Sequence, residues 1–355
     1  MKKFKKYSIF ALIFVSFILC AQVVPNRVAT AAQTSRAECV MEVNSGRILF
    51  NGNADIKLPI ASTTKILTAI TAIENFDINA ETTVKKECVG IEGSSIYLRE
   101  GEKLTLLELL YGLMLRSGND CAETIASNFC ARDKFIRLMN GTAKNCGAIN
   151  SNFVNPHGLP DDEHYSTAFD LAKVTAHALK NDVFRKIVSA KRVQISNDGF
   201  EYKRTLINKN KLLFSDSRCI GVKTGYTKKA GRCLVSAFES GGMTIVSVVL
   251  NSPDMWLRSE ECVNNAFSTY KNVAVIDAEK INDCVFTAKN GKKFMINVDK
   301  SFSYPLKDGE IDDITVKIGD KEFGEFIKNP ESCAEIKVYL KNDLIFSSKA
   351  VSILK

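Results

Sequence analysis

The chain has 355 residues, of which 45% are hydrophobic and 25% are charged. This is an ordinary globular composition, and the length allows two domains. The formal net charge is +8, but residues 1–31 hold five basic and no acidic residues, so the remainder has 43 basic against 40 acidic residues, or +3. That charge is too small to favour nucleic acid binding, and we expect no nucleic acid partner.

The first 31 residues have the pattern of a secretory signal peptide. Four lysines lie within the first six residues, an apolar run covers residues 7 to about 20, and small residues follow at 29–31. We therefore expect residues 1–31 to direct export, which would make the protein extracytoplasmic. Two alternatives stay open: an uncleaved N-terminal anchor, and lipidation at Cys20, which the large side chain of Leu19 disfavours.

Eleven cysteines are present, and ten of them follow residue 31. An even number in an exported protein permits a set of disulfides. However, a chain of this length can bury a core without crosslinks, and the cysteines occur singly, often within apolar helical patterns. We favour buried, reduced cysteines over disulfides. Because no Cys-x-x-Cys pair occurs, a zinc ribbon is not expected.

The predicted elements begin with two strands joined by a turn at residues 44–46. A helix starts near Ser62. Apolar spacing then predicts a helix from Leu106 to Leu115, followed by a break at residues 117–119. The next helix runs to about Cys130.

Two helix starts carry candidate caps. Asn119 and Asp120 can cap the helix after the break, and Ser166 is the expected N-cap of an amphipathic helix at residues 166–180. The apolar stripe of this last helix consists of Ala168, Leu171, Ala172, Thr175 and Leu179.

The second half of the chain is rich in strands. Segments 219–227, 232–240 and 243–251 have β character, and Gly241-Gly242 predicts a tight turn between the last two. A helix is expected over about residues 254–270. Short alternating strands with Asn-Gly and Asp-Gly turns follow, so we divide the mature chain into a domain at 32–272 and an all-β domain at 273–355.

The segment PIASTTKILTA places a serine three residues before a lysine. On a helix, Ser62 and Lys65 share a face. A serine hydroxyl becomes a good nucleophile only when a base takes its proton, and a lysine amine can be that base if burial or nearby cations lower its pKa. In isolation, however, a helix cap followed by a surface lysine explains this spacing better.

Two further motifs have the same ambiguity. Ser117 and Asn119 stand in a short connection, where they could bind the lysine and a substrate, or simply break a helix. Lys223 and Thr224 could hold a carboxylate, and Gly225 would let a ligand approach the strand, but a charged edge strand has the same residues.

The order of the three motifs changes the interpretation. Ser-x-x-Lys, Ser-x-Asn and Lys-Thr-Gly, separated by about 50 and about 105 residues, form the signature of penicillin-binding proteins and serine β-lactamases. Over roughly residues 36–270 the chain resembles the serine D-Ala-D-Ala carboxypeptidases, which are low-molecular-mass penicillin-binding proteins. The resemblance is carried by segments such as GSSIYLREGEKLTLLELLYGLMLRSGNDCAE and GVKTGYTKKAGRCLVSA.

This resemblance implies an α+β fold: a β-lactamase/transpeptidase-like catalytic domain with a helical cluster on an antiparallel sheet, followed by a small all-β domain. It also implies removal of the terminal D-Ala from peptidoglycan stem pentapeptides in the cell wall, inhibition by β-lactams, and no cofactor or metal. Three residues would be catalytic, namely Ser62 as nucleophile, Lys65 as base and Ser117 in proton transfer. Five would bind substrate, namely Asn119, Lys223, Thr224, Gly225 and Tyr226, and the backbone amides of Ser62 and Tyr226 would form an oxyanion hole.

The chain departs from the family pattern in two places. Lys228 and Lys229 stand where relatives often have an acidic residue, which puts the peptide preference in question. The C-terminal sequence alternates like a strand, whereas many relatives end in an amphipathic helix that lies on the membrane. Peripheral membrane association therefore remains open only through a retained N-terminal segment.

Three alternatives remain. A class A β-lactamase needs a glutamate between the second and third motifs, and only Glu163 is offered, without the expected neighbours. A β-lactam sensor or wall-binding protein would share the fold without turnover. A zinc peptidase would need ligands, but the three histidines, His157, His164 and His177, form no His-Glu-x-x-His motif, and His157 is expected to brace a loop.

Overall fold

The computed structural model describes residues 36–196, 203–282, 285–287, 293–298, 300–318 and 333–354. The predicted signal peptide at residues 1–31 lies outside these ranges, as does Cys20, so both stay predictions. Within the described ranges, no helix combines the length and the apolar character needed to cross a membrane.

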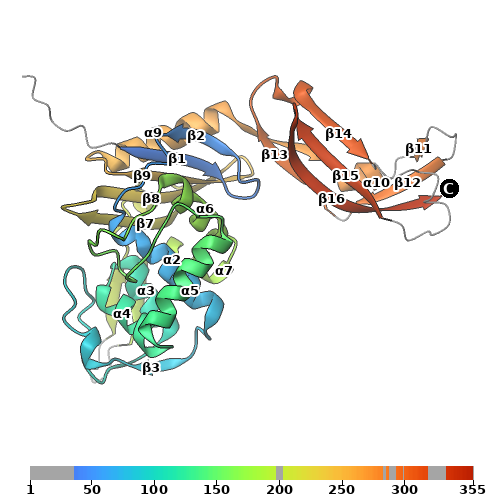
Figure 1. Cartoon of the computed structure of the whole chain (residues 1–355). Coiled ribbons are helices and arrows are strands. Elements are labelled where there is room, and N and C mark those ends of the chain that lie inside the picture. Colours follow the sequence, from blue (N-terminus) through green and yellow to red (C-terminus); the bar gives the residue numbers. More distant parts are fainter. Residues whose placement is uncertain are drawn as a thin grey trace, which may run out of the picture. The chain divides into compact units, whose positions relative to one another are not determined.

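A five-stranded antiparallel sheet organises the larger region (Figure 1). Its strand order is β2-β1-β9-β8-β7, with bounds Ile48–Gly52, Ala37–Glu42, Met243–Leu250, Gly231–Ser240 and Cys219–Thr227. The predicted turn at Gly241-Gly242 is confirmed, because Ser240 pairs with Met243 across it. Strand β7, which carries the Lys-Thr-Gly motif, lies at the edge of the sheet.

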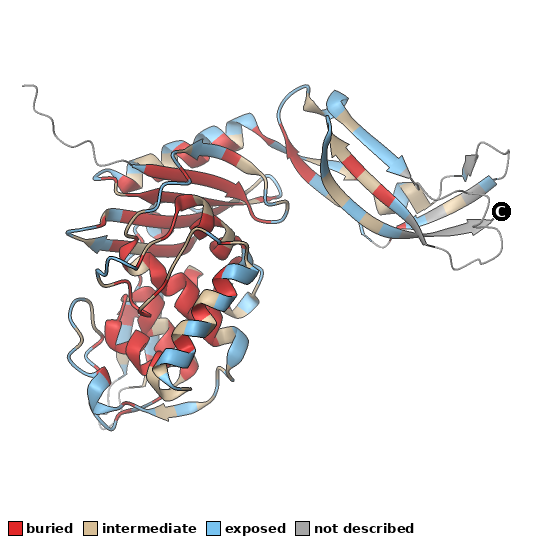
Figure 2. Cartoon of the chain, in the orientation of Figure 1, coloured by how far each residue is buried: buried red, intermediate tan, exposed pale blue. Residues whose placement is uncertain are grey.

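The central strands of the sheet, β1, β9 and β8, are buried along most of their length, and they are mainly red in Figure 2. Side chains alternate along each strand with a period of two. On β1, Cys39 and Met41 pack into the core of the helical cluster, while Val40 packs with Cys262 and Ala266 of a helix on the opposite face. This double coverage explains why the central strands are almost continuously apolar.

The helical cluster packs on one face of the sheet and shares one hydrophobic core with it. It consists of the 3-10 helix η2 and the α-helices α2 to α7, which are Ala61–Thr64, Lys65–Asn75, Leu106–Leu115, Asn119–Asn128, Arg132–Asn145, Ala168–Leu179 and Asp182–Ser189. Helix α9 (Met255–Thr269) packs on the other face through Met255 and Val263.

Shorter elements connect the cluster. The strand pairs β3–β4 (Glu81–Thr83, Lys103–Thr105) and β5–β6 (Arg192–Ile195, Arg204–Ile207) are two-stranded, and η3 (Lys86–Cys88) and α8 (Leu212–Ser215) are single turns. None of them was expected from the apolar pattern, because each is too short to show a period.

Helix α3 begins and ends where the apolar spacing predicts, and Thr105 and Glu108 form a capping box at its start. This capping box was not predicted, and the two caps that were predicted, at Asn119 or Asp120 and at Ser166, were wrong. Helix α4 begins at Asn119 itself, and its N-cap, Gly118, makes no side-chain cap. The N-cap of α6 is Thr167, whose hydroxyl accepts from the Asp170 amide, and not Ser166.

Among the residues that the structure describes after α9, the elements are strands apart from two short turns of helix. Strand β10 (Lys271–Ile276) pairs with β13 (Phe302–Leu306), and a second sheet has the order β11-β12-β16-β15-β14. Its strands are Val285–Thr287, Lys293–Val298, Asp343–Leu354, Cys333–Leu340 and Ile314–Ile318, and the helical turns are α10 (Ala278–Asn282) and η4 (Glu310–Asp313). A small core of Ile276, Val298, Ile336 and Val338 holds it together. The α+β class with a separate small all-β region is therefore confirmed.

The eight cysteines whose side chains are described are all free, and six of them are buried. Burial raises the pKa of the Cys39 thiol to about 12 and that of Cys233 to about 11, so these thiols stay protonated and unreactive. The preference for buried, reduced cysteines is confirmed for these six, whereas Cys130 and Cys146 are free but half-buried. Cys284 and the side chain of Cys333 lie outside the described part.

Two glycines with similar left-handed backbones differ in their surroundings. Gly158 has φ +84°, and a Cβ there would lie 1.9 Å from the carbonyl oxygen of Ala61 in η2. Gly101 has φ +81°, and apart from its chain neighbours no atom of the described residues lies within 4 Å of that position. Gly158 therefore lets its loop approach the turn that carries Ser62, whereas Gly101 only meets a local backbone requirement.

We predict that Gly158→Ala destabilises the fold more than Gly101→Ala. The control, Gly101→Ala, should lower the free energy of unfolding by about 1–2 kcal/mol, because alanine is strained in a left-handed backbone. Gly158→Ala should lose about 1–3 kcal/mol more, because its Cβ overlaps backbone that cannot simply rotate away. Urea unfolding of both variants measures this difference. Equal losses would contradict the close approach between this loop and η2.

Candidate active site

The first motif brings a serine and a lysine together at a helix start. Ser62 lies in the 3-10 helix η2, and the α-helix proper begins three residues later at Lys65. The Lys65 Nζ and Ser62 Oγ lie 3.0 Å apart, within hydrogen-bonding distance. The predicted neighbourhood is therefore confirmed. The alternative of a surface lysine is wrong, because Lys65 has no exposed surface.

Two more oxygens accept from the Lys65 amine. They are Asn119 Oδ1 and the backbone carbonyl of His157, each at 2.7 Å. A neutral amine has two N–H groups and one lone pair, and the two short bonds can use both N–H groups. The lone pair is then left for the Ser62 hydroxyl. This arrangement presents the amine to Ser62 as a proton acceptor.

The surroundings also favour the neutral form of Lys65. Burial is the largest cause of a pKa well below the ordinary value of 10.5, and the positive charge of Lys223 is the second. Asp120 acts in the opposite direction but is outweighed. Desolvation and a like charge thus act together to favour the neutral amine over the ammonium.

The second motif supplies one acceptor and one hydroxyl. Ser117 has a left-handed backbone (φ +65°) and a buried side chain, and its hydroxyl has no hydrogen-bond partner within the described ranges. Asn119 is held on three sides: its Oδ1 accepts from Lys65, its Nδ2 donates to the Glu92 carbonyl, and its amide donates to the Ser94 carbonyl at 2.7 Å. The prediction that this loop binds Lys65 holds for Asn119 and not for Ser117.

Asp120 does not cap the helix. Its side chain instead fixes the loop at residues 92–98. Its buried carboxylate accepts from Ser95 Oγ at 2.5 Å, from the Ile96 amide at 3.1 Å and from the Leu98 amide at 3.0 Å. Several hydrogen bonds to one carboxylate make it a rigid anchor. The loop at residues 92–98 is thus tied to α4 by two consecutive side chains.

The third motif lies on edge strand β7. Lys223 is buried, and its Nζ donates to the Thr224 carbonyl at 2.8 Å. Burial, followed by the charge of Lys209, lowers the pKa of Lys223 to about 7. An ammonium that is this poorly solvated gains strongly from an anionic partner. Lys209, which the sequence did not single out, is exposed and donates to Ser94 Oγ at 3.0 Å.

Gly225 explains how the strand and the serine turn come together. A Cβ at this position would lie 3.0 Å from the Ser62 amide nitrogen and 3.1 Å from the Ile60 carbonyl. Only a glycine allows this approach without displacing η2. The amide of Ser62 therefore lies next to Gly225, one residue before Tyr226. The side chain of Tyr226 is 64% exposed.

The three histidines are engaged in separate contacts. His157 Nε2 contacts Glu123 Oε1 at 3.0 Å, His164 Nε2 contacts Thr64 Oγ1 at 2.8 Å, and His177 contacts Glu74 on the surface. The described ranges hold no cluster of three or more His, Cys, Asp or Glu side chains that suits a metal. Since each imidazole already has a partner, the zinc peptidase alternative gains no support.

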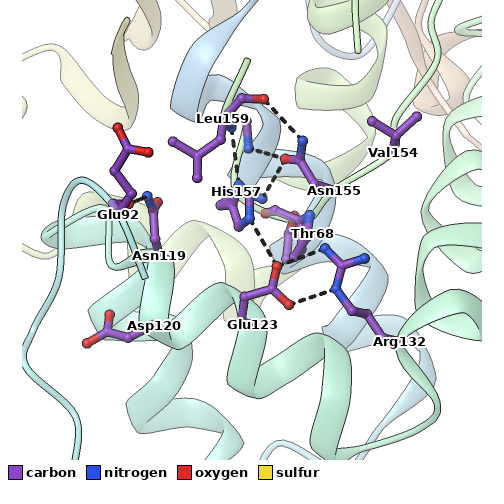
Figure 3. Close-up of polar contacts among 12 residues, drawn as sticks. Thr68, Glu92, Asn119, Asp120, Glu123, Arg132, Val154, Asn155, His157 and Leu159 are labelled. Carbon is purple, nitrogen blue, oxygen red and sulfur yellow. Dashed lines mark hydrogen bonds and ion pairs between the residues drawn. The ribbon is translucent and has the colours of Figure 1, made fainter. Parts of the chain in front are cut away.

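A buried glutamate behind Lys65 was not predicted (Figure 3). Glu123 of α4 receives a hydrogen bond from His157 and two from Arg132, both at 2.9 Å. Burial alone would raise the pKa of Glu123, but the donors from His157 and Arg132 outweigh it and bring it to about 2. No motif marks this glutamate, since its role depends on a contact across 34 residues of sequence.

Glu163, the candidate for a class A β-lactamase, is exposed. Its backbone carbonyl accepts from Asn152, and its amide donates to Asp161. A deacylating glutamate must reach a water beside the acyl-enzyme, so an exposed side chain in this loop does not fit that role.

Comparison with known proteins agrees with the geometry. The family model described as D-alanyl-D-alanine carboxypeptidase matches residues 24–254. The D-alanyl-D-alanine carboxypeptidase DacF of Bacillus subtilis is 28% identical over 342 residues. The alignment covers 90% of this chain and 88% of the DacF sequence. A D-alanyl-D-alanine carboxypeptidase of a Streptomyces species is 36% identical over 238 residues, covering 62% of this chain and 82% of its own.

Solved structures give the same answer for the fold. The crystal structure of a Streptomyces DD-transpeptidase matches with a TM-score of 0.60 and 36% identity, covering 65% of this chain and 96% of that one. The D-alanyl-D-alanine carboxypeptidase DacD of Francisella tularensis matches with a TM-score of 0.66 and 23% identity, covering 89% of this chain and 92% of that one, and so shows the fold alone. With the family model spanning the three motifs and the sheet, this chain belongs to the serine D-alanyl-D-alanine carboxypeptidase family.

Proposed function

We propose that this protein removes the terminal D-Ala from peptidoglycan stem pentapeptides through an acyl-enzyme on Ser62. The observation that carries the proposal is the Lys65 amine, which is fully buried and hydrogen-bonded to Ser62 Oγ at 3.0 Å. A buried lysine beside a serine has no structural advantage over an apolar residue. It does have a chemical one, because it can take the hydroxyl proton.

The acylation step follows from these contacts. Lys65 takes the proton of the Ser62 hydroxyl while Oγ attacks the carbonyl carbon of the penultimate D-Ala. The backbone amides of Ser62 and Tyr226 hold the developing oxyanion. As the tetrahedral intermediate collapses, the amine of the terminal D-Ala leaves with a proton that Lys65 returns, with Ser117 in the path. Water then attacks the ester, and the same groups run the proton transfers in reverse.

Lys223 and Thr224 would bind the terminal carboxylate of the substrate. The low pKa of Lys223, about 7, means that its charge is poorly stabilised in the free protein. A carboxylate beside it would supply the missing stabilisation, which favours substrates that end in a free carboxyl group. Asn119 would hold the substrate amide with its side chain, and Gly225 leaves room for the peptide along β7.

β-Lactams would acylate Ser62 as substrate analogues. Residues 1–31 would serve as a signal peptide, so the enzyme would act outside the cytoplasm in wall maturation and cell shape. We assign catalysis to residues 32–272. We assign to residues 273–355 a role in placing the catalytic region, with peripheral membrane association left to the N-terminal segment.

We predict that Ser62→Ala abolishes covalent binding of benzylpenicillin. Intact-mass spectrometry of the wild-type protein should show a single adduct with the mass of the drug, and the variant should show none. Wild-type protein should also release D-Ala from a pentapeptide, and an added acceptor amine would separate hydrolysis from peptide transfer. A folded wild-type protein without an adduct would remove the enzyme assignment, whereas an adduct without D-Ala release would favour a sensor.

We predict a bell-shaped pH dependence of kcat/KM. The rate should rise with pH as Lys65 loses its proton, because only the amine accepts a proton from Ser62. It should fall again as Lys223 loses its charge, whose pKa is about 7, so that the alkaline limb lies well below 10.5. A pentapeptide with a C-terminal amide has no carboxylate to bind Lys223. It should therefore lack the alkaline limb, and the same limb on both substrates would contradict the role of Lys223.

A further inference from the structure

We propose that Glu123 and the imidazole of His157 are positioning residues for the Lys65 base. They would act by fixing the His157 carbonyl, which accepts from Lys65 Nζ at 2.7 Å. The inference rests on the proposed role of Lys65. It adds a dependence of the base on a buried hydrogen bond between His157 and Glu123, which touches neither Ser62 nor the substrate.

The carbonyl matters because the amine has only two N–H groups in its neutral form. Asn119 Oδ1 takes one, and the His157 carbonyl takes the other, both at 2.7 Å. If either acceptor moves, the amine rotates toward another partner, and its lone pair no longer faces the Ser62 hydroxyl. The orientation of the base thus depends on two oxygens, and only one of them belongs to a recognised motif.

The loop that carries this carbonyl is internally braced. Asn155 Oδ1 accepts from the amide of Gly158 at 2.7 Å and more weakly from that of His157 at 3.3 Å. Asn155 Nδ2 donates to the Leu159 carbonyl at 3.1 Å, and the Leu159 amide donates to His157 Nδ1 at 3.1 Å. The loop at residues 155–159 therefore holds its own shape, and its placement depends on what ties it to the helices.

Besides Lys65 itself, two side chains among the described residues make those ties, and both are drawn in Figure 3. Thr68 of α2 donates to the Pro156 carbonyl at 2.6 Å. The second tie is the imidazole itself. Because His157 Nδ1 accepts from Leu159, the ring proton must sit on Nε2, which donates to Glu123 Oε1 at 3.0 Å. Burial lowers the pKa of His157, so the ring can hold this bond while neutral.

Helix α4 therefore positions both acceptors of the base. Asn119 and Glu123 are four residues apart on this helix and share a face. Asn119 contacts Lys65 directly, and Glu123 reaches it through His157. Two hydrogen bonds from Arg132, each at 2.9 Å, hold the Glu123 carboxylate in one orientation. A single rigid element then sets the geometry of the lone pair.

The test compares Glu123→Ala with Glu123→Gln by rapid-quench mass spectrometry of benzylpenicillin acylation. Rates are expressed per active site, using the final adduct yield as the active fraction. Glu123→Ala should lower the saturating acylation rate constant about tenfold, with the apparent dissociation constant of the drug changed less than about twofold. Glu123→Gln should stay within about threefold of wild type, because its Oε1 still accepts from His157 Nε2.

If Glu123→Ala does not fold, His157→Ala tests the same hydrogen bond from its other side. It removes the imidazole and leaves Glu123 paired with Arg132. Its loss should match that of Glu123→Ala. The double variant should be no slower than His157→Ala alone, because both changes break one chain of contacts.

Glu38→Ala is the matched control. Glu38 is buried and receives two hydrogen bonds from Arg258, at 2.7 and 3.0 Å, between β1 and α9 on the other face of the sheet. This variant should lower the melting temperature and the active fraction without changing the acylation rate per active site. A merely structural role for Glu123 would give that same result for Glu123→Ala.

The outcomes separate the two proposals. Wild-type protein that is not acylated would overturn the role of Ser62 and Lys65 before Glu123 is tested. Normal wild-type acylation, with Glu123→Ala and His157→Ala equally fast per active site, would overturn the positioning role alone. A loss in Glu123→Ala that Glu123→Gln does not recover would also overturn it, because the hydrogen bond would then not be what matters.

Discussion

The complete burial of the Lys65 amine is the constraint on which the rest of the site depends. A buried ammonium costs several kcal/mol unless it is paired, and none of the described carboxylates is hydrogen-bonded to this one. The fold meets the cost in part by lowering the pKa of the group and in part by placing three oxygens around it. Each oxygen comes from a different segment, so the base exists only when η2, α4 and the loop at residues 155–159 are all in place.

Close backbone approaches make that assembly possible. Gly225 brings the edge strand against the Ser62 amide, and Gly158 brings its loop against the Ala61 carbonyl. Side chains at either position would separate segments that must meet within hydrogen-bonding distance. The site is therefore specified as much by the absence of side chains as by the reactive groups themselves.

The sequence predicts what local patterns encode. The bounds of α3 follow from apolar spacing, and the strands β7 to β9 follow from their alternation and the Gly241-Gly242 turn. The closeness of Ser62 and Lys65 follows from one turn of helix. The helix starts at Asn119 and Ala168 were less accurate, because several neighbouring polar residues could each cap, and tertiary contacts decided: Asp120 binds a distant loop instead.

Contacts between distant segments could not be predicted in this way. The His157 carbonyl is a backbone atom, so no residue type signals that it will accept from Lys65. Glu123 and Arg132 lie on helix faces that would suit solvent equally well, and only the fold turns them toward His157. Such groups carry no motif because their chemistry is ordinary and their position is what matters.

The electrostatics of the site also indicate how it can remain active once substrate is bound. Lys223 is the second cause of the low pKa of Lys65, and a substrate carboxylate beside Lys223 would partly neutralise that charge. Taken alone, this would raise the pKa of Lys65 and weaken the base at the moment it is needed. Burial is the larger cause, however, and a bound peptide excludes still more water. Substrate binding thus weakens the smaller cause of the low pKa of Lys65, which is the charge of Lys223. It strengthens the larger cause, which is burial, and burial favours the neutral amine.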